Sequence, residues 1–563
     1  MPEQPLTHMS VQLNGSDAPA DFMDDLIDVS IENSLHLPGV ATVVLHDPSL
    51  YWLDYENLLP GKAIKIFVKM ASQETLLFDG EIVEIEPHFG RGAQELTVRA
   101  FDRLYKLSRG TYARSFVNVS DSDIIEKIAG EVGLSAQVGP TSLVYPYVFQ
   151  NNESNLAFLQ KRAAALGFLL YVTGKTLHCE APRGSNTVQL TWGVELREFY
   201  PRMTTLGQVD TVSARGWDPS QKQAVQGQAK KEQRDAPNVG YSEGTGQVRE
   251  AFYMGGQTLV ADRPMREQSV AQSLAQAVAS QVAGSFIEAE GLCQGTPTLI
   301  AGVSVQINKV GKRFSGIYFV TSTVHTYSAQ QGYVTRFTVS GHQPCTLFAL
   351  LSTEEKVETQ RGLVVGIVTD NKDPQNQGRV KVKYPWLTEE HSSDWARVIA
   401  PGAGAQRGIE FLPEVNDEVL VGFEMGDINY PYVLGGLWNG KDAIPKDVVS
   451  GSVQQRIIRS RTGHMITLDD NDSGGGITIE DSKGNKLVFN SQENKLTITV
   501  QGDTEIQAQG NMKLGAQGNM TLQAQGNISV QATAEAEVKG TAGVKVDGGP
   551  AIVEVKGSMI NLN

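Results

Sequence analysis

The most regular pattern of apolar and polar positions lies near the C-terminal end of the chain. The dipeptide Gln-Gly recurs with a period of eight at Gln501, Gln509, Gln517 and Gln525. Within each unit the fourth and sixth positions are the apolar ones, and alanine occupies the eighth. The same spacing continues on both sides of the Gln-Gly units. We expect the following positions to form the core of this segment: Leu496, Ile498, Met512, Leu514, Met520, Leu522, Ile528, Val530, Val538, Val544 and Val546.

This octad pattern predicts strands. Apolar residues two positions apart, with a polar residue between them, are typical of a β-strand with one buried face. A glycine in every octad allows a positive φ, so the chain can turn a corner after each strand. An alternative is a disordered Gln/Gly/Asn-rich tail, but the regular apolar spacing argues against it.

The number of octads favours three chains over one. A single-chain solenoid needs about three faces per coil, and residues 493–548 hold seven octads, or about two and a third coils. That is fewer than the roughly three repeats that such a stack needs. Three chains that each supply one face would instead form a long, continuously buried prism. The sequence therefore predicts a homotrimeric, intertwined β-helix over residues 485–563.

Residues 1–350 combine short strand-like runs with three helical segments. The runs include AIKIFVKM and QELTVRAFD. Helices are expected at about 121–132, 154–166 and 264–283, the last with a stripe of valine, leucine and alanine, whereas the polar residues 218–248 predict an exposed loop. Two blocks share the plan Phe-x-Gly, strand, loop, strand: FDGEIVEIEPHFGRGAQELTVRAFD and FSGIYFVTSTVHTYSAQQGYVTRFTVSG. This weak duplication predicts an α+β domain with two related barrel-like parts.

Residues 362–440 predict a separate small barrel. Five short apolar runs alternate with Gly, Pro, Asn and Asp turns, which is typical of an oligonucleotide/oligosaccharide-binding (OB) fold. Residues 441–484 are expected to be transition strands that lead into the octads. The predicted fold class is therefore mainly β and multidomain.

Composition narrows the function classes. The net charge of −15 and the absence of a dense Lys/Arg run argue against nucleic acid as a partner. The most apolar stretch is interrupted by Lys161 and Arg162, so no integral membrane segment is expected. The N-terminus lacks the layout of a signal peptide. Cys179, Cys293 and Cys345 lie far apart, which favours reduced, buried thiols in a cytosolic protein.

Three stretches together resemble the VgrG-type central spike proteins of contractile injection systems. FDGEIVEIEP, LTVRAFDRLYKLSRGTYARSFVNVSDSDIIEKIAGEVGL and ESNLAFLQKRAAALGFLLYV are similar to the hub, or base, domain of that family. GIVTDNKDPQNQGRVKVKYPW, EFLPEVNDEVLVGFEMGD and PYVLGGLWNG are similar to the spike OB domain. The octads match the needle, and the order of the three parts is the family's order.

The resemblance implies a homotrimer in which two hub parts per chain give a pseudo-sixfold base. That base would join a hexameric inner tube protein and baseplate proteins, and effector cargo is a further possible partner. A PAAR-type tip protein would cap the needle at Met559, Ile560, Asn561, Leu562 and Asn563. No lysozyme is expected between the OB unit and the needle, and no effector domain is expected after Asn563. The implied protein is a non-enzymatic piercing spike, assembled in the bacterial cytoplasm and ejected with its particle.

Candidate chemistry is sparse. Asp469, Asn471, Ser473, Gly474 and Glu480 have the spacing of an EF-hand calcium loop, but strand-like flanks favour a hairpin. His342 and Cys345 have a ligand-like spacing without a second pair, which favours a structural role. Hence no catalytic residue, cofactor or metal is expected. Two other classes stay open: a cell-wall hydrolase carried on a stalk, and a glycan-binding adhesin that uses residues 362–440.

Overall fold

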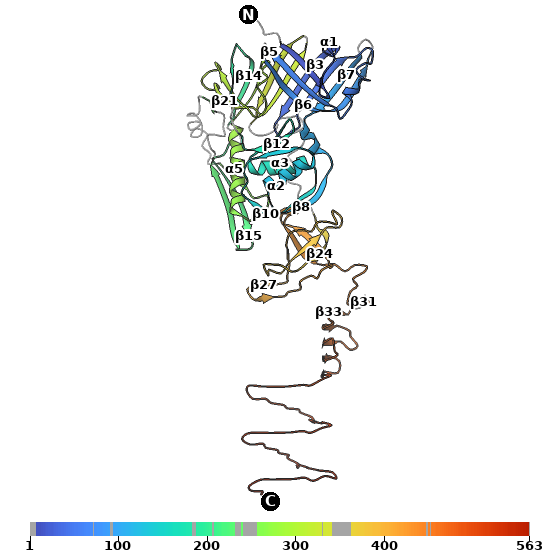
Figure 1. The fold of residues 1–563 in the computed structure, drawn as a ribbon. Coiled ribbons are helices and arrows are strands. Elements are labelled where there is room, and N and C mark those ends of the chain that lie inside the picture. The colour runs from blue at the N-terminus through green and yellow to red at the C-terminus, as the bar shows by residue number, and fades with distance from the viewer. Residues whose placement is uncertain are drawn as a thin grey trace. The chain divides into compact units, whose positions relative to one another are not determined.

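The chain forms two compact units, Met1–Ala443 and Ile444–Asn563 (Figure 1). The computed structural model describes residues 7–70, 73–90, 94–182, 187–204, 208–230, 238–239, 256–328, 330–340, 362–445, 449–450 and 452–561. His342 and Cys345, and the last two predicted tip residues, Leu562 and Asn563, lie outside these ranges.

An eleven-stranded sheet runs through the first unit, in the order β14-β19-β23-β22-β3-β4-β7-β6-β5-β1-β2. Seven of its strands come from residues 7–101: the short β2, described below, and β1 (Thr7–Leu13), β3 (Leu26–Ser34), β4 (Val40–His46), β5 (Ala63–Met70), β6 (Gln73–Phe89) and β7 (Gln94–Phe101). Four come from the second block: β14 (Leu196–Met203), β19 (Ile287–Gln294), β22 (Ser322–Ser328) and β23 (Gly332–Val339). The short β2 is Ser16–Asp17, and the first block also holds α1 (Ala20–Asp24) and η1 (Glu56–Leu58).

The two blocks repeat one topology, which agrees with the duplication expected from the sequence. The first runs β3-β4-β7-β6 and the second β14-β19-β23-β22. Gly80 of the first Phe-x-Gly motif pairs with Ile64 on β5. Gly316 of the second motif, on β21 (Gly316–Phe319), pairs with Ile307 on β20 (Ser304–Asn308). β20 and β21 belong to a separate four-stranded sheet, which β13 (Thr187–Thr191) and β17 (Asn238–Val239) complete.

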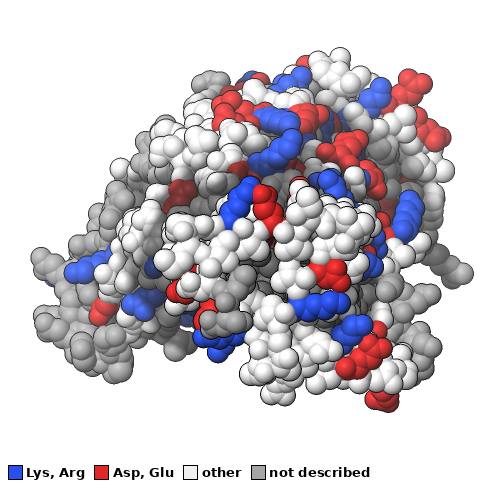
Figure 2. Space-filling view, turned by 90° about the horizontal axis from the view of Figure 1, so that it is seen from below, with Lys and Arg blue, Asp and Glu red and all other residues white. Residues whose placement is uncertain are grey.

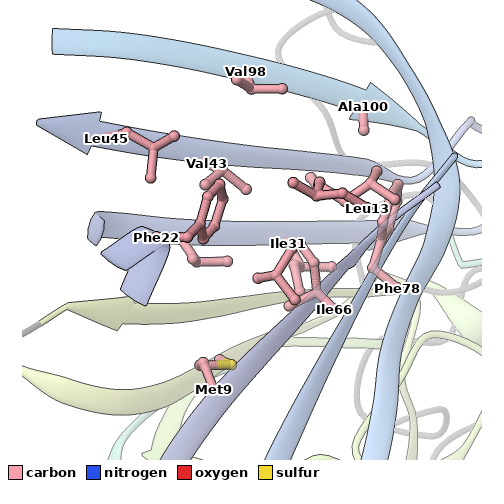
Figure 3. Close-up of a cluster of buried hydrophobic side chains, with 14 of the residues drawn as sticks. Met9, Leu13, Phe22, Ile31, Val43, Leu45, Ile66, Phe78, Val98 and Ala100 are labelled. Atoms are coloured by element: carbon pink, nitrogen blue, oxygen red, sulfur yellow. The ribbon is translucent and has the colours of Figure 1, made fainter. Parts of the chain in front are cut away.

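The blocks join head to tail. In the order of the sheet, β22 is the last strand of the second block and β3 the first strand of the first block. The two strands pair antiparallel, so Val324 lies opposite Glu32. Each block buries one face of its strands, as the alternation predicted. In the first block, side chains such as Phe22, Ile31, Val43 and Ile66 converge into one cluster (Figure 3). A separate cluster around Tyr318 and Phe337 fills the second block.

Two of the predicted helices lie between the blocks in sequence and share one core. α2 (Asp121–Glu131) begins at a capping box in which Ser120 and Asp123 bond reciprocally. α3 (Asn155–Leu166) begins at Ser154 and ends at Gly167, which is left-handed. They pack with η2 (Arg103–Ser108), β8 (Tyr112–Ser120), β9 (Ser135–Val138), β10 (Val144–Glu153), β11 (Leu169–Thr173) and β12 (Thr176–Glu180). Both helix predictions are confirmed.

The predicted loop over 218–248 is wrong in part, because it contains β16 (Gln223–Lys230). This strand pairs with β15 (Thr211–Asp218), which also pairs with β18 (Gln257–Val260). The third predicted helix, α5 (Gln268–Gly284), packs on β16 through alanines, and a Cβ on Gly227 would meet the backbone of Ala271 at 2.2 Å. The Gln272 amide both donates to and accepts from the backbone of Gln228. Small residues and backbone bonds hold this strand, so it carries little apolar signal.

The predicted five-stranded barrel is confirmed. β24 (Val364–Asp370), β25 (Arg379–Lys383), β26 (Ala396–Val398), β30 (Pro431–Gly436) and β29 (Glu418–Phe423) close on one another. The hairpin β27 (Ala403–Gly404) and β28 (Arg407–Gly408) and the turn η4 (Glu424–Gly426) lie outside the barrel strands. This OB domain is joined to β10, because Phe149 is buried in the barrel's apolar cluster and its N–H donates to Asn429 Oδ1 at 2.7 Å.

The second unit begins with an antiparallel meander. β33 (Gln455–Arg459), β34 (Met465–Asp469), β35 (Gly476–Glu480), β36 (Lys486–Asn490) and β37 (Lys495–Thr499) follow one another in order, after the short pair β31 (Val449–Ser450) and β32 (Ser452–Val453). The calcium-like loop is the β34–β35 hairpin turn, with Asp469 paired to Gly476 and Asn471 N–H donating to Asp469. Strands on both sides agree with the hairpin interpretation.

A buried histidine lies beside the seam between the two blocks. His325 on β22 has its Nδ1 2.8 Å from the Tyr333 hydroxyl and 3.2 Å from Thr335 Oγ1. Burial lowers the pKa of His325 to about 4, so its ring is neutral in the folded chain at neutral pH. The unfolded chain, with the ordinary histidine pKa near 6.5, binds a proton first as pH falls.

We therefore expect the contribution of His325 to stability to be complete above about pH 6.5. It should decline as pH falls toward 4, by at most about 3 kcal/mol. Denaturation midpoints measured between pH 4 and 7 test this. His325→Gln should flatten the profile, whereas His46→Gln, at an exposed position, should not. An unchanged slope in His325→Gln would assign the acid sensitivity to other groups.

Candidate assembly surfaces

One face of the β33–β37 meander is apolar from edge to edge. Strand pairing places Ile458, Ile466, Ile479, Leu487 and Ile498 side by side across the five strands. A second row on the same face holds Leu468, Ile477, Phe489 and Leu496. Period-two alternation in each strand builds this face.

This apolar face is more exposed than the polar face behind it. Phe489 is 44% exposed and Ile458 52%, whereas Thr467, on the polar face, is 6% exposed. A continuous exposed apolar area of this kind marks an interaction site. The prediction from sequence placed only transition strands before residue 485, so the contribution of Ile458, Ile466 and Ile477 to such a surface was missed. The sequence feature that could have revealed this surface is the alternation of apolar and polar residues within each short strand.

The octads form an open coil with few contacts of their own. Within the described part of this segment, residues 501–561, no strand is formed, and one backbone–backbone hydrogen bond is made, from Ala551 N to Gly548 O. In Figure 1 the red-brown trace swings from side to side, and its successive passes are separate. A Cβ built on Gly510, Gly518 or Gly526 would meet nothing within 4 Å.

Exposure follows the octad register. At the fourth position Met512, Met520, Ile528 and Val544 are 51–58% exposed, and at the sixth position Leu514, Leu522, Val530, Val538 and Val546 are 71–80% exposed. Leu496 and Ile498 belong to β37 and are also exposed. The structure brings none of these predicted core residues together within one chain.

Ile506 shares this register but was left out of the predicted core. It occupies the sixth position of the octad that starts at Gln501, and its side chain is 73% exposed. Thr504 takes the fourth position of that octad, which obscured the pattern. At the predicted tip, Met559 and Ile560 are 78% and 50% exposed, and Asn561 is exposed.

The run of strands from β14 to β6 has an open strand edge at each end, although β5, β1 and β2 continue the sheet from the first half of β6. Among the described strands, β14 pairs only with β19, and the distal part of β6, beyond Ile82, pairs only with β7. The distal part of β6 carries Glu84 and Glu86, each 3.0 Å from Arg99. β14 carries Arg197, Arg202 and the 66%-exposed Tyr200. Edges with unpaired backbone groups are templates for further strands.

The next question is whether the described residues could hold a metal ion or supply a reactive thiol. Among them no group of three or more His, Cys, Asp and Glu side chains could hold a metal ion. Cys179 and Cys293 are buried and free, and burial raises the pKa of the Cys179 thiol to about 12. No helix in the described ranges is long and apolar enough to cross a membrane. On the face seen in Figure 2, basic and acidic side chains are interspersed.

Comparison with known proteins identifies both parts of the first unit. The family model "Alg8 N-terminal domain" matches residues 3–329, more than half of the chain. The model "Type VI secretion system/phage-baseplate injector OB domain" matches residues 364–438.

Two spike proteins of Pseudomonas aeruginosa are similar in sequence. VgrG5 is 28% identical over 155 residues, which cover 26% of this chain and 18% of that protein. VgrG1b is 30% identical over 148 residues, which cover 26% of this chain and 19% of that protein. Both are named type VI secretion system spike proteins. The matched segment therefore spans about a fifth of each relative's length.

Solved structures share the fold. One chain of a half-lidded PdpA–VgrG complex from Francisella aligns over 88% of this chain and 88% of its own, with a TM-score of 0.52 and 9% identity. The Escherichia coli c3393 protein, a type VI secretion component described as similar to the T4 tail proteins gp27 and gp5, aligns over 76% of this chain and 99% of its own, with a TM-score of 0.50 and 13% identity. With its β-rich first unit and its baseplate OB barrel, the chain belongs to the Alg8 N-terminal domain family and is similar to VgrG spike proteins.

Proposed function

We propose that this chain is the homotrimeric spike of a contractile injection machine. Residues 1–350 would form the hub that joins the inner tube, and the OB domain would connect it to the needle. The needle would pierce the target envelope when the machine contracts. The role is structural, and no reacting group is required of the chain.

One observation carries this proposal: about sixty residues hold a regular apolar register in an open coil that satisfies almost none of its own backbone groups. Backbone N–H and C=O groups need hydrogen-bond partners, and a single chain in this coil supplies almost none. If two more copies wind into the gaps between the passes, each strand acquires neighbours on both sides. The fourth and sixth positions of all three chains then face one axis, where burial stabilises each aliphatic side chain by about 1.5–3 kcal/mol.

The hub supports the same threefold assembly. Because β22 pairs with β3 head to tail, the same contact can repeat between the distal part of β6 in one chain and β14 in the next. Such a heterologous contact continues until rotation closes it. Three chains of eight strands would close a ring with six repeats, which suits a hexameric tube. Acidic Glu84 and Glu86 would then lie beside the edge strand that carries basic Arg202, which is complementary in charge.

The remaining partners are inferred from the same architecture. A PAAR-type tip protein would bind Met559, Ile560 and Asn561 together with Leu562 and Asn563, which lie outside the described residues. Baseplate proteins would surround the hub, and the particle would be assembled in the bacterial cytoplasm before ejection. The similarity to type VI secretion system spike proteins supports a secretion-system component.

The test is the solution mass of the full-length chain by light scattering. We expect three times 61.1 kDa, independent of dilution through the micromolar range. A monomer at all concentrations would contradict the trimeric spike. Peptidoglycan turnover by the same preparation would favour a hydrolase instead.

A further inference from the structure

A pocket of about 390 Å³ lies on the face of the first unit's sheet opposite the second block's core. Its lining comes from four adjacent strands and one turn: Arg197, Leu292, Val324, Thr326, Gln331, Val334 and Arg336. The β22 and β23 members alternate with the buried His325, Thr335 and Phe337, so the pocket residues point away from the core.

Arg336 stands at the centre of this pocket. Its cross-strand neighbours are Leu292 on β19 and Val324 on β22, so its guanidinium rises from an apolar floor. Val334, two residues before it, extends the floor toward Thr326. Arg197 on β14 lines the same hollow from the neighbouring strand.

Neither guanidinium has a carboxylate partner in the part of the chain that the structure describes, although this protein carries more acidic than basic residues. Most of its other basic clusters are paired, as Arg99 is with Glu84 and Glu86. The nearest acid on the same face is Glu290, which lies on the neighbouring strand β19 opposite Thr338, diagonal to Arg336. Glu198 and Glu32 lie farther away, two strands from Arg336. Two unpaired arginines above aliphatic side chains form a site for a carboxylate attached to an apolar body.

We propose that this pocket binds the C-terminal carboxylate and the apolar last side chain of a polypeptide. The arginines would each donate to the carboxylate, since the planar guanidinium matches its two oxygens. Leu292, Val324 and Val334 would contact the terminal side chain, and Thr326 and Gln331 would hydrogen-bond the last peptide groups. A partner of this kind needs only a free, apolar C-terminus to be held.

The position of the pocket in the assembled ring indicates what such binding would do, and this step rests on the proposed function. A closed ring of about 24 strands at about 4.8 Å spacing is only about 37 Å across, too narrow to enclose six packed cores. The cores would therefore lie outside and the pocket face inside, on the wall of the channel that joins the tube. A polypeptide carried in that channel would be held by its end until contraction.

The test measures binding of two labelled hexapeptides to the full-length chain by fluorescence anisotropy. Both end in Ala-Leu, one with a free carboxylate and one with an amide. We expect the free acid to bind and the amide to bind at least tenfold more weakly. Arg336→Gln and Arg197→Gln should each weaken the acid peptide about tenfold or more. Arg215→Gln, at an exposed arginine on β15 outside the pocket, should leave it unchanged.

Equal binding of acid and amide, or binding that neither pocket variant changes, would overturn the proposal. A peptide ending in Gly-Gly that binds as tightly as Ala-Leu would overturn the apolar half of the site. Circular dichroism of each variant checks that it is folded. Peptide binding by a chain that proves monomeric would retain the pocket and reject the spike, whereas a trimer without peptide binding would do the reverse.

Discussion

We expect the substitution Leu522→Asp to abolish the trimer. Leu522 occupies the sixth position of an octad and is 72% exposed in the single chain. In the proposed needle it lies at the axis, so the substitution brings three carboxylates together away from water. Each buried, unpaired charge costs several kcal/mol, and the mutual repulsion adds to this cost. Light scattering should report a smaller mass, or a trimer that dissociates at far higher concentration than the parent.

The neighbouring residue supplies the control. In the proposed needle, Thr521 would precede Leu522 on the same strand and point to the opposite side. Thr521→Asp adds the same charge to a solvent-facing position and should leave the mass unchanged. If both variants stay trimeric in detergent, the inward assignment of the sixth position is wrong. If both dissociate, charge anywhere on the needle is sufficient, and the register is not established.

The second large effect concerns the joint between the hub and the OB domain. Phe149, in the middle of β10, is 4% exposed within the barrel's apolar cluster. Phe149→Ala leaves a cavity in that cluster, and we expect a loss of about 3–5 kcal/mol in the free energy of unfolding. Val144→Ala on the same strand, at a 56%-exposed position, should cost well under 1 kcal/mol. Urea denaturation of the two variants makes the comparison.

Polar contacts also connect the hub to the OB domain, in addition to the apolar packing of Phe149. Tyr147 OH donates to Ser392 O at 2.9 Å, and Arg266 Nη2 lies 2.7 Å from Glu424 Oε2. Both contacts link residues of the hub to the OB domain. We therefore expect Phe149→Ala to increase protease cleavage around the barrel before the β3–β22 sheet opens. Simultaneous cleavage of both regions would mean that the joint carries no separate stability.

The sequence by itself determined much of this protein, because much of it is local. Ser120 and Ser154 start helices and Gly167 ends one through contacts within a few residues. The OB strands and the five-strand meander follow from period-two alternation between turn residues. The octad register was also legible, since it depends only on spacing. Ile506 was overlooked because threonine replaces its apolar companion.

Other features needed the tertiary structure, because they depend on residues far apart in the chain. β16 is held by hydrogen bonds between its backbone and the Gln272 side chain of α5 and by the close approach at Gly227, neither of which leaves an apolar pattern. The head-to-tail pairing of β22 with β3 joins residues almost three hundred positions apart. The burial of Phe149 in a barrel that begins two hundred residues later is equally non-local. The two arginines of the pocket are 139 positions apart in sequence and meet only because β19 lies between their strands. Spacing records which face a residue takes within its own strand, whereas only the order of strands in the sheet decides which distant residue lies beside it.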